Sequence, residues 1–315
     1  MIKRTMLALA GAAALLSAAP ALAQDTKVIA VSIPAATHGW TGGVVYHAEA
    51  AAKEIKAAFP NIDVIVNTSP SAVAQVGVLE DLVATRKPDA LVILPFTSEE
   101  LTGPVQSVKE AGTFITVVDR GLTDESIQDL YVAGDNIAVG ATTAQFLIEE
   151  LGKGDVVVLR GIPTVIDDER IQGFQDALKG SDIKILDIQY AYWNRDDAFK
   201  VMQDYLAKYP KIDAVWANDD DMLLGVLEAI QQAGRTDIKF ALGANGMKEI
   251  IEKVMEGDPL TPISTPYPPS MIKTAVYLTA ANLNGQAPIR GKVILDAPRI
   301  TKENAQEFYF PDSPF

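Results

Sequence analysis

Charged side chains stand at the points where several apolar runs of this sequence end. Asp119 and Arg120 follow the run Phe114 to Val118, and Asp219 comes two residues after the run Ala214 to Ala217. A carboxylate accepts hydrogen bonds from adjacent hydroxyls while a guanidinium donates in a planar fork, so Asp119 and Arg120 together match a vicinal diol. The alternative is a local ion pair that caps the strand. The pattern indicates a site for a small, hydroxyl-rich molecule.

Arg170 and Asp219 extend this set of candidate binding residues. Arg170 lies one turn inside a predicted helix at 168–179, where an arginine is poorly placed beside the positive end of the helix dipole. That position favours a binding role, and the alternative is that the acids at 167–169 neutralise it. We expect Asp219 to turn inward toward hydroxyls, while Asp220 and Asp221 cap the next helix. A cation site is disfavoured because no alternating Asp-x-Asp spacing accompanies these acids.

Three aromatic residues, Trp40, Phe96 and Trp193, lie in loop-like or strand-end surroundings. Flat rings stack on the apolar C–H face of a sugar while polar neighbours bind its rim, so these residues are candidates for stacking. The alternative for each is burial in the core, as is usual for aromatic residues. His38, two residues before Trp40, is a further ligand-binding candidate from the same loop.

The composition excludes several kinds of site. The chain has no cysteine among its 315 residues, which removes disulfides, thiolate metal sites and cysteine nucleophiles. His38 and His47 are its two histidines, so a metal hydrolase or a serine–histidine triad would have to use one of them. The glycines at 39, 42 and 43 lack the spacing of a phosphate-binding loop. We therefore expect neither a metal nor a cofactor.

The first 23 residues have the pattern of an export signal. Lys3 and Arg4 give a positive start, an apolar stretch follows at 6–19, and small residues precede Gln24. A membrane anchor is the alternative, but the apolar stretch is shorter than the roughly 20 residues that span a bilayer. We expect cleavage between Ala23 and Gln24 and a periplasmic location for the rest of the chain.

The charge of the chain is strongly acidic. It carries 27 bases and 41 acids, a net charge of −14. The predicted signal contains two bases and no acid, so its removal leaves 25 bases against 41 acids and a net charge of −16. Such a surface repels phosphate backbones and anionic lipid, and we expect no nucleic-acid partner.

Apolar, β-branched runs alternate with amphipathic stretches along the remaining chain. This order predicts an α/β fold of doubly wound parallel sheets, in two halves with a cleft between them. Ligands bind such sheets at the carboxyl ends of the strands, which adds Asn245 and Thr265 to the candidates. The predicted strands lie at 27–33, 62–67, 90–94, 114–118, 130–133, 155–160, 183–189, 213–217, 238–243 and 262–265, and the predicted helices at 42–58, 72–86, 98–111, 136–151, 168–179, 195–208, 220–233, 246–256 and 269–284.

Local motifs in a fixed order give the chain a resemblance to a known family. They are Ile115-Thr116-Val117-Val118-Asp119-Arg120, Gly134-Asp135-Asn136, Glu169-Arg170-Ile171-Gln172-Gly173-Phe174, Trp216-Ala217-Asn218-Asp219-Asp220-Asp221-Met222 and Gly243-Ala244-Asn245-Gly246. From Lys27 to about Asp296 the chain resembles the ribose-type periplasmic binding proteins of ABC importers. The resemblance implies sugar-hydroxyl contacts from Asp119, Arg120, Arg170 and Asp219, stacking by Trp40 and Trp193, and last polar contacts from Asn245 and Thr265.

The resemblance also implies two lobes joined by three chain crossings, near 133–135, 264–267 and 294–298. One lobe would contain residues 24–133 plus 267–295 and the other 134–266 plus 296–315, with hinge closure burying the ligand. The sequence departs from the family at Asp219, where asparagine is common, and at Ala244-Asn245, where an aromatic–aspartate pair is common. The expected ligand is therefore a pentose, a hexose or a small polyol.

The implied function is the periplasmic solute-binding component of an ABC transporter, a monomer whose partner is a membrane permease. An alternative is a component that presents its ligand to a chemoreceptor or takes up a quorum signal. A glycosidase using Asp119 and Asp219 as paired carboxylates is disfavoured, because neighbouring arginines lower a carboxyl pKa and oppose a protonated general acid. We therefore expect no enzymatic activity.

Overall fold

The computed structural model describes residues 26–36, 38–286 and 288–315. The predicted export signal at 1–23 lies outside these ranges. Within them, no helix combines the length and the apolar character that a bilayer crossing would need.

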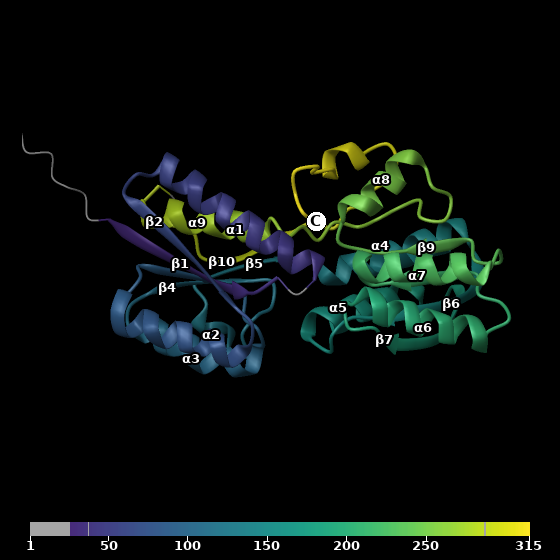
Figure 1. Ribbon diagram of the computed structural model, residues 1–315, viewed down its shortest axis with the longest axis horizontal. Coiled ribbons are helices and arrows are strands. Elements are labelled where there is room, and N and C mark those ends of the chain that lie inside the picture. The colour runs from purple at the N-terminus through teal and green to yellow at the C-terminus, as the bar shows by residue number, and fades with distance from the viewer. Residues whose placement is uncertain (1–25, 37, 287) are drawn as a thin grey trace, which may run out of the picture.

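The chain forms two lobes, each built on a parallel sheet (Figure 1). The first sheet has the order β10-β5-β4-β3-β1-β2 and the second has the order β7-β6-β8-β9. The predicted fold class, two doubly wound α/β lobes, is confirmed. The strands of the first sheet are β1 (Lys27–Pro34), β2 (Ile62–Ser69), β3 (Ala90–Ile93), β4 (Phe114–Val118), β5 (Leu130–Gly134) and β10 (Gly291–Leu295), and those of the second are β6 (Lys153–Arg160), β7 (Asp182–Tyr190), β8 (Ala214–Ala217) and β9 (Phe240–Leu242).

Helices cover both faces of each sheet, which is why the central strands are apolar on both sides. In β1, Ile29 and Val31 pack into the core cluster that contains residues of α1 (Gly39–Ala58) and α9 (Met271–Leu283). Ala30 packs into the cluster on the other face, which contains residues of α2 (Ala72–Asp81) and α3 (Ser98–Glu110). The helices of the first lobe are α1 (Gly39–Ala58), α2 (Ala72–Asp81) with a π-helical continuation η1 (Leu82–Arg86), α3 (Ser98–Glu110) and α9 (Met271–Leu283). Those of the second are α4 (Asn136–Glu150), α5 (Val165–Leu178), α6 (Arg195–Lys208), α7 (Asp220–Ala233) and α8 (Lys248–Glu256).

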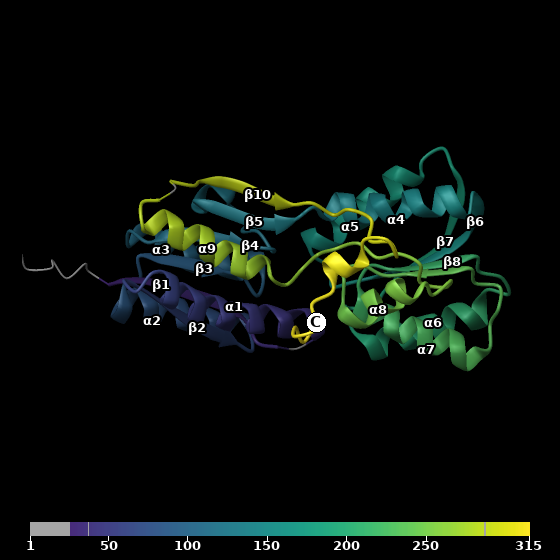
Figure 2. The ribbon, with the colours of Figure 1, turned by 90° about the horizontal axis from the view of Figure 1, so that it is seen from above.

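The chain passes between the two sheets more than once (Figure 2). It leaves the first sheet after β5, returns to it at α9 and β10, and then runs to the short helices and turns that pack beside α8 in the second lobe. This last segment contains the 3₁₀ helix η3 (Ala305–Phe308). A second 3₁₀ helix, η2 (Glu125–Ile127), lies in the first lobe between β4 and β5. Residues that meet between the lobes are therefore far apart in sequence.

Two parts of the sequence-based assignment of strands were wrong. The segment 262–265 is not a strand; it makes only isolated bridges, Asn245 with Pro266 and Ser264 with Ile300. Flanking prolines at 262 and 266 lack the N–H groups that a ladder requires. Conversely, β10 was not predicted, because as an edge strand it is largely exposed and lacks a long apolar run.

Glycines bring α4 and α5 into backbone contact, and this contact positions the polar residues at their first turns. A Cβ on Gly140 would lie 2.0 Å from the carbonyl oxygen of Arg170, and one on Gly173 would lie 2.1 Å from the carbonyl oxygen of Ile137. Real Cβ atoms do not approach this closely, so any larger residue would push the helices apart. Arg170 on α5 therefore stands at a fixed distance from Asn136 on α4.

We predict that Gly140→Ala destabilises the protein by about 1–3 kcal/mol, because overpacking forces a helix backbone to shift. Urea unfolding followed by circular dichroism measures this change. Gly77→Ala is the matched control: Gly77 also lies inside a helix, α2, but a Cβ there meets nothing within 4 Å. The control should be more stable than the parent protein by up to about 1 kcal/mol, from helix propensity alone. Equal effects of the two substitutions would contradict the proposed backbone contact.

Candidate functional site

A cavity of about 440 Å³ lies between the lobes, where the carboxyl ends of both sheets meet. The first lobe contributes residues that follow β1, β3 and β4, and the second contributes residues that follow β6, β7, β8 and β9. Nine of the ten predicted binding residues line it: His38, Trp40, Phe96, Asp119, Arg120, Arg170, Trp193, Asp219 and Asn245. Thr265 is not among the lining residues; it is buried, and its carbonyl accepts a hydrogen bond from the Asn245 amide at 2.7 Å.

Asp119 is held in place by its backbone and by two tyrosines. Its φ of 58° is in the left-handed region, which an aspartate tolerates better than most residues and which turns the chain sharply after β4. The Tyr131 hydroxyl donates to its carbonyl oxygen at 2.6 Å, and the Tyr267 hydroxyl donates to its Oδ1 at 2.5 Å. Burial raises the pKa of Asp119, and the nearby positive charge of Arg120 opposes that shift.

Arg120 supports the neighbouring strand end instead of forming an ion pair with Asp119. Its guanidinium donates to the carbonyl oxygens of Pro95, at 3.2 Å, and of Phe96. These bonds hold the loop after β3 so that Phe96 lines the cavity. Asp119 and Arg120 form no ion pair with each other, so the strand-capping alternative is wrong.

Arg170 is 2% exposed, and hydrogen-bond acceptors of the second lobe compensate the burial of its positive charge. Its Nε donates to Asn136 Oδ1 at 3.0 Å, and a terminal nitrogen donates to the Asn218 carbonyl at 2.6 Å. The ring of Tyr267 lies over the guanidinium, with 4.5 Å between the guanidinium carbon and the ring centroid. A buried guanidinium with this set of partners is fixed in orientation before any ligand is present.

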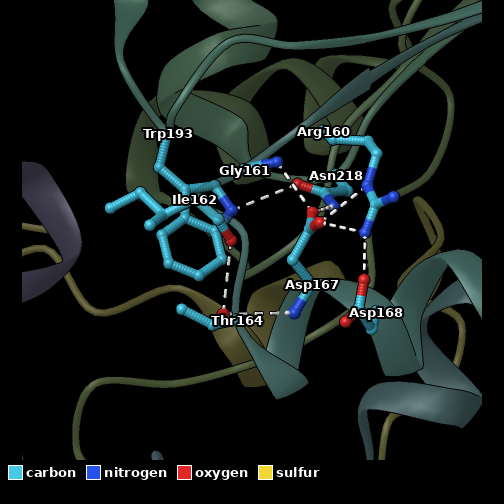
Figure 3. A network of polar contacts seen from close by, with 8 residues as sticks. All are labelled: Arg160, Gly161, Ile162, Thr164, Asp167, Asp168, Trp193 and Asn218. Carbon is cyan, nitrogen blue, oxygen red and sulfur yellow. Dashed lines mark hydrogen bonds and ion pairs between the residues drawn. The ribbon is translucent and has the colours of Figure 1, made fainter. Parts of the chain in front are cut away.

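The acids next to Arg170 do not neutralise it, so that alternative is also wrong. Asp167 accepts instead from Arg160, at 2.7 Å, from the Gly161 amide, at 2.8 Å, and from Asn218, at 2.6 Å (Figure 3). Asp168 pairs with the same Arg160. This network ties the start of α5 to the ends of β6 and β8.

Trp193 belongs to the same network (Figure 3). Its indole nitrogen donates to Asn218 Oδ1 at 3.1 Å, and its φ of 53° is left-handed. A Cβ on Gly161 would lie 1.9 Å from that indole nitrogen, so the ring can reach its position only because residue 161 is glycine. Trp193 is therefore presented to the cavity by a rigid support.

Among the three consecutive aspartates, the capping role falls on a different residue from the one predicted. Asp219 lines the cavity, but it is also the N-cap of α7: Oδ1 accepts from the Met222 amide at 3.1 Å, and Oδ2 accepts from Asn245 Nδ2 at 2.7 Å. Asp220 is fully buried and accepts from the Met247 amide at 2.8 Å. The assignment of capping to Asp220 and Asp221 was wrong, because the cap is Asp219.

Asp221 joins the two lobes. Its Oδ2 accepts from the Gly39 amide at 3.0 Å, and its Oδ1 accepts from Arg195 at 3.0 Å. Gly39 is the first residue of α1 in the first lobe, whereas Asp221 and Arg195 belong to helices of the second. A carboxylate beside a helix N-terminus is stabilised by the free amides and the dipole of that helix.

The first loop supplies His38 and Trp40. His38 is the N-cap of α1: its amide donates to Thr41 Oγ1 at 3.2 Å, and its carbonyl accepts from the same hydroxyl at 3.0 Å. Burial lowers the pKa of its imidazole, so the ring is neutral near pH 7. The Trp40 indole donates to the Tyr267 carbonyl at 2.8 Å.

Sequence reasoning missed Tyr267, which contacts both lobes. It contacts Asp119 through its hydroxyl, Arg170 through its ring and Trp40 through its carbonyl. Its position inside the predicted crossing at 264–267, beside Pro266 and Pro268, was the available signal. Also missed were the segments 162–166 and 97–99, which line the cavity from the first turns of α5 and α3.

The lining of the cavity has no excess of positive charge. Its bases, Arg120 and Arg170, are accompanied by three acids, Glu99, Asp119 and Asp219. Among residues 26–36, 38–286 and 288–315, no cluster of three or more acidic, histidine or cysteine side chains could hold a metal ion. The arrangement disfavours an anionic guest and offers both donors and acceptors to hydroxyl groups.

Comparison with known proteins identifies the family. The family model for the periplasmic binding protein domain matches residues 29–287. The chain belongs to this family. Because it is a family of solute-binding proteins, membership supports the expectation of a binding protein over an enzyme.

Individual relatives of this periplasmic binding protein fit the same picture. A xylitol-binding protein of Mycolicibacterium smegmatis is 30% identical over 253 residues, covering 78% of this chain and 70% of the relative. A ribose import binding protein of Bacillus subtilis is 32% identical over 195 residues, covering 61% of this chain and 62% of the relative.

Solved structures of the same fold include proteins with bound sugars and polyols. An ABC transporter solute-binding protein of Bacillus halodurans with bound myo-inositol has a TM-score of 0.80 at 22% identity, covering 90% of this chain and 97% of that one. A periplasmic solute-binding protein of Actinobacillus succinogenes with bound D-allose has a TM-score of 0.78 at 26% identity, covering 89% of this chain and 99% of that one.

We predict that Asp219 makes the stability of this binding protein pH-dependent. Burial, with a smaller effect of Asp221, raises the pKa of Asp219 to about 7. Because the folded-state pKa is raised, the stabilising contribution is fully present below the unfolded value near 4 and is lost as the pH rises through about 7. Between pH 5 and pH 8 this loss amounts to about 2 kcal/mol.

Asp219→Asn removes the titration but keeps an oxygen that can cap α7. The Asn245 amide can turn over so that its Oδ1, which has no partner among the described residues, accepts from the new amide. Urea unfolding of the ligand-free protein at pH 5, 6, 7 and 8 should show a flatter profile for Asp219→Asn than for the parent. Parallel profiles would contradict the assignment.

We predict that Tyr267→Phe destabilises the protein by about 1–3 kcal/mol at pH 8, because it leaves a buried carboxylate oxygen of Asp119 without its donor. Tyr131→Phe is the matched control, since it removes a bond to the neutral carbonyl of the same residue. That bond is worth about 1 kcal/mol. The midpoints of urea unfolding measure the change in stability of both variants, provided that their m-values equal that of the parent protein. A smaller loss for Tyr267→Phe than for Tyr131→Phe would contradict the importance of the Asp119 contact.

Proposed function

We propose that this chain captures a neutral monosaccharide or sugar alcohol in the interlobe cavity and delivers it to the permease of an ABC importer. The observation that carries the proposal is that Asp119 and Arg170, which line the cavity, are already oriented by protein partners, in a lining without an excess of positive charge. A guest with hydroxyl groups can donate to and accept from such groups without adding a net charge. The names of the relatives, which bind xylitol, ribose and D-allose, support the same ligand class.

The ligand contacts that we propose come from both lobes. Asp119 Oδ2 and the donors of Arg120 and Arg170 would bind hydroxyls, together with Asp219, Asn245 and the neutral imidazole of His38. Trp40, Phe96 and Trp193 would stack on the apolar C–H face of the guest. Thr265 would act only indirectly, by holding the backbone of Asn245.

Lobe movement completes the proposal. Residues 24–133 with 267–295 and residues 134–266 with 296–315 would turn about the crossings near 133–135, 264–267 and 294–298. The two lobes would separate at the Asp221–Gly39 contact on opening and re-form it on closure. Export, with cleavage between Ala23 and Gln24, would place the monomeric protein in the periplasm, where it meets the permease. An experiment that tests whether the permease or a chemoreceptor captures the ligand-bound protein distinguishes these two partners.

The first test is a thermal-shift screen of the purified protein against xylitol, D-ribose, D-allose and myo-inositol. A ligand that binds only the folded state adds about 2.7 kcal/mol at 100 times its Kd, which raises the Tm. Ribose 5-phosphate is the charged control, because the lining has no excess of positive charge to compensate its phosphate. If neutral sugars and polyols leave the Tm unchanged, the proposed ligand class is wrong.

For any ligand found, we predict that Asp119→Ala lowers the affinity by at least tenfold, because a ligand hydroxyl that loses its charged acceptor is buried unpaired. Isothermal titration calorimetry measures the change. Asp204→Ala, which removes an exposed carboxylate on α6, is the control and should bind like the parent protein. Unchanged affinity in Asp119→Ala would remove Asp119 from the site.

A further inference from the structure

The cavity has an apolar wall that hydroxyl binding does not explain. We use this name for Phe96, Ile162, Pro163 and Val165, which all line the cavity. Ile162 and Val165 are 37% and 62% exposed, whereas the next residue along the chain, Ile166, is buried. Apolar surface left open to water at the mouth of a binding cavity is a common mark of a contact yet to be made.

The segment that carries most of this wall is held rigidly. The Gly161 amide donates to Asp167 at 2.8 Å, and the Thr164 hydroxyl donates to the Ile162 carbonyl at 3.3 Å (Figure 3). Thr164 is the N-cap of α5, and Arg160 fixes the acids of its first turn. Because these bonds fix the backbone, the side chains of Ile162 and Val165 cannot be buried by a local collapse of the loop.

Protein partners already use part of the polar capacity of the cavity. Asp219 accepts on both oxygens from protein donors, and Asp119 accepts on Oδ1 from Tyr267. The polar atoms without a partner belong to other lining residues, such as His38 and Asn245. The side chains of the apolar wall offer no hydrogen bond, so a ligand hydroxyl turned toward them would be buried unpaired and would lower the affinity.

We propose that the ligand of this site, within the sugar-binding function proposed above, carries an apolar substituent that lies against the apolar wall. The ligand class is a sugar with an alkyl or aryl group, such as an alkyl or phenyl glycoside. Its hydroxylated ring would face Asp119, Arg170 and Asn245. Its substituent would cover Ile162, Val165 and Phe96, so the exposed apolar surface becomes buried only in the complex.

The test compares matched probes by calorimetry: D-ribose, D-xylose, D-galactose and D-allose, each beside its methyl, propyl and phenyl β-glycoside. Burial of a methylene contributes about fourfold in affinity. We therefore expect propyl and phenyl glycosides of the preferred sugar to bind at least tenfold more tightly than the free sugar.

A double variant, Ile162→Ser with Val165→Ser, isolates the wall. It should lose most of the gain from the substituent, measured as the ratio of the Kd of the free sugar to the Kd of its glycoside in the same variant. Val73→Ser is the matched control: Val73 is 77% exposed near the start of α2 and does not line the cavity. That variant should keep the full gain.

The outcomes separate this inference from the function on which it depends. If free sugars bind but their glycosides bind no more tightly, the apolar substituent is excluded and the sugar-binding function stands. If the gain persists in the double variant, the wall is not the contact and the inference is wrong. If neither free sugars nor glycosides bind, the proposed function fails and the inference fails with it.

Discussion

The site depends on one constraint: charged groups buried between two lobes must be compensated by the protein itself. Burying an unpaired ion costs several kcal/mol, and the cost falls only when charge partners and hydrogen bonds replace water. Tyr267 meets this requirement for both lobes at once, since its hydroxyl contacts Asp119 and its ring covers Arg170. The remaining partners of Arg170 come from the second lobe, so the guanidinium is oriented whether or not a guest is present.

The same constraint explains why the supporting residues are small or left-handed at particular places. Gly140 and Gly173 let α4 and α5 touch, which places Asn136 within reach of Arg170. Gly161 leaves room for the indole of Trp193, and Asp119 adopts a left-handed backbone so that its carboxylate faces the cavity. Each of these features costs conformational freedom or local strain, and each is offset by the interactions that it permits.

Much of the fold and the polar part of the cavity follow from the sequence, because both derive from regular elements. Apolar runs predict strands, and the rule that ligands bind at strand ends selects Asp119, Arg120 and Asn245 without coordinates. Tyr267, Ile162 and Pro163 are in irregular segments, where no periodicity indicates which side chains point inward. Capping was assigned to Asp220 and Asp221 when the N-cap is Asp219, because capping preferences do not distinguish neighbouring acids. The strand β10 was missed because an exposed edge strand has no apolar pattern.

The contact between Asp221 and the first amide of α1 has a consequence for lobe closure. Both partners belong to the chain, so the free energy of this contact favours closure whatever the ligand contributes. A larger closed fraction in the absence of ligand raises the apparent affinity, because less binding energy is used to select the competent state. The same fraction presents an unloaded protein in the loaded shape. A transport system that reads shape alone would then bind empty carriers, and the strength of this carboxylate contact influences how often that happens.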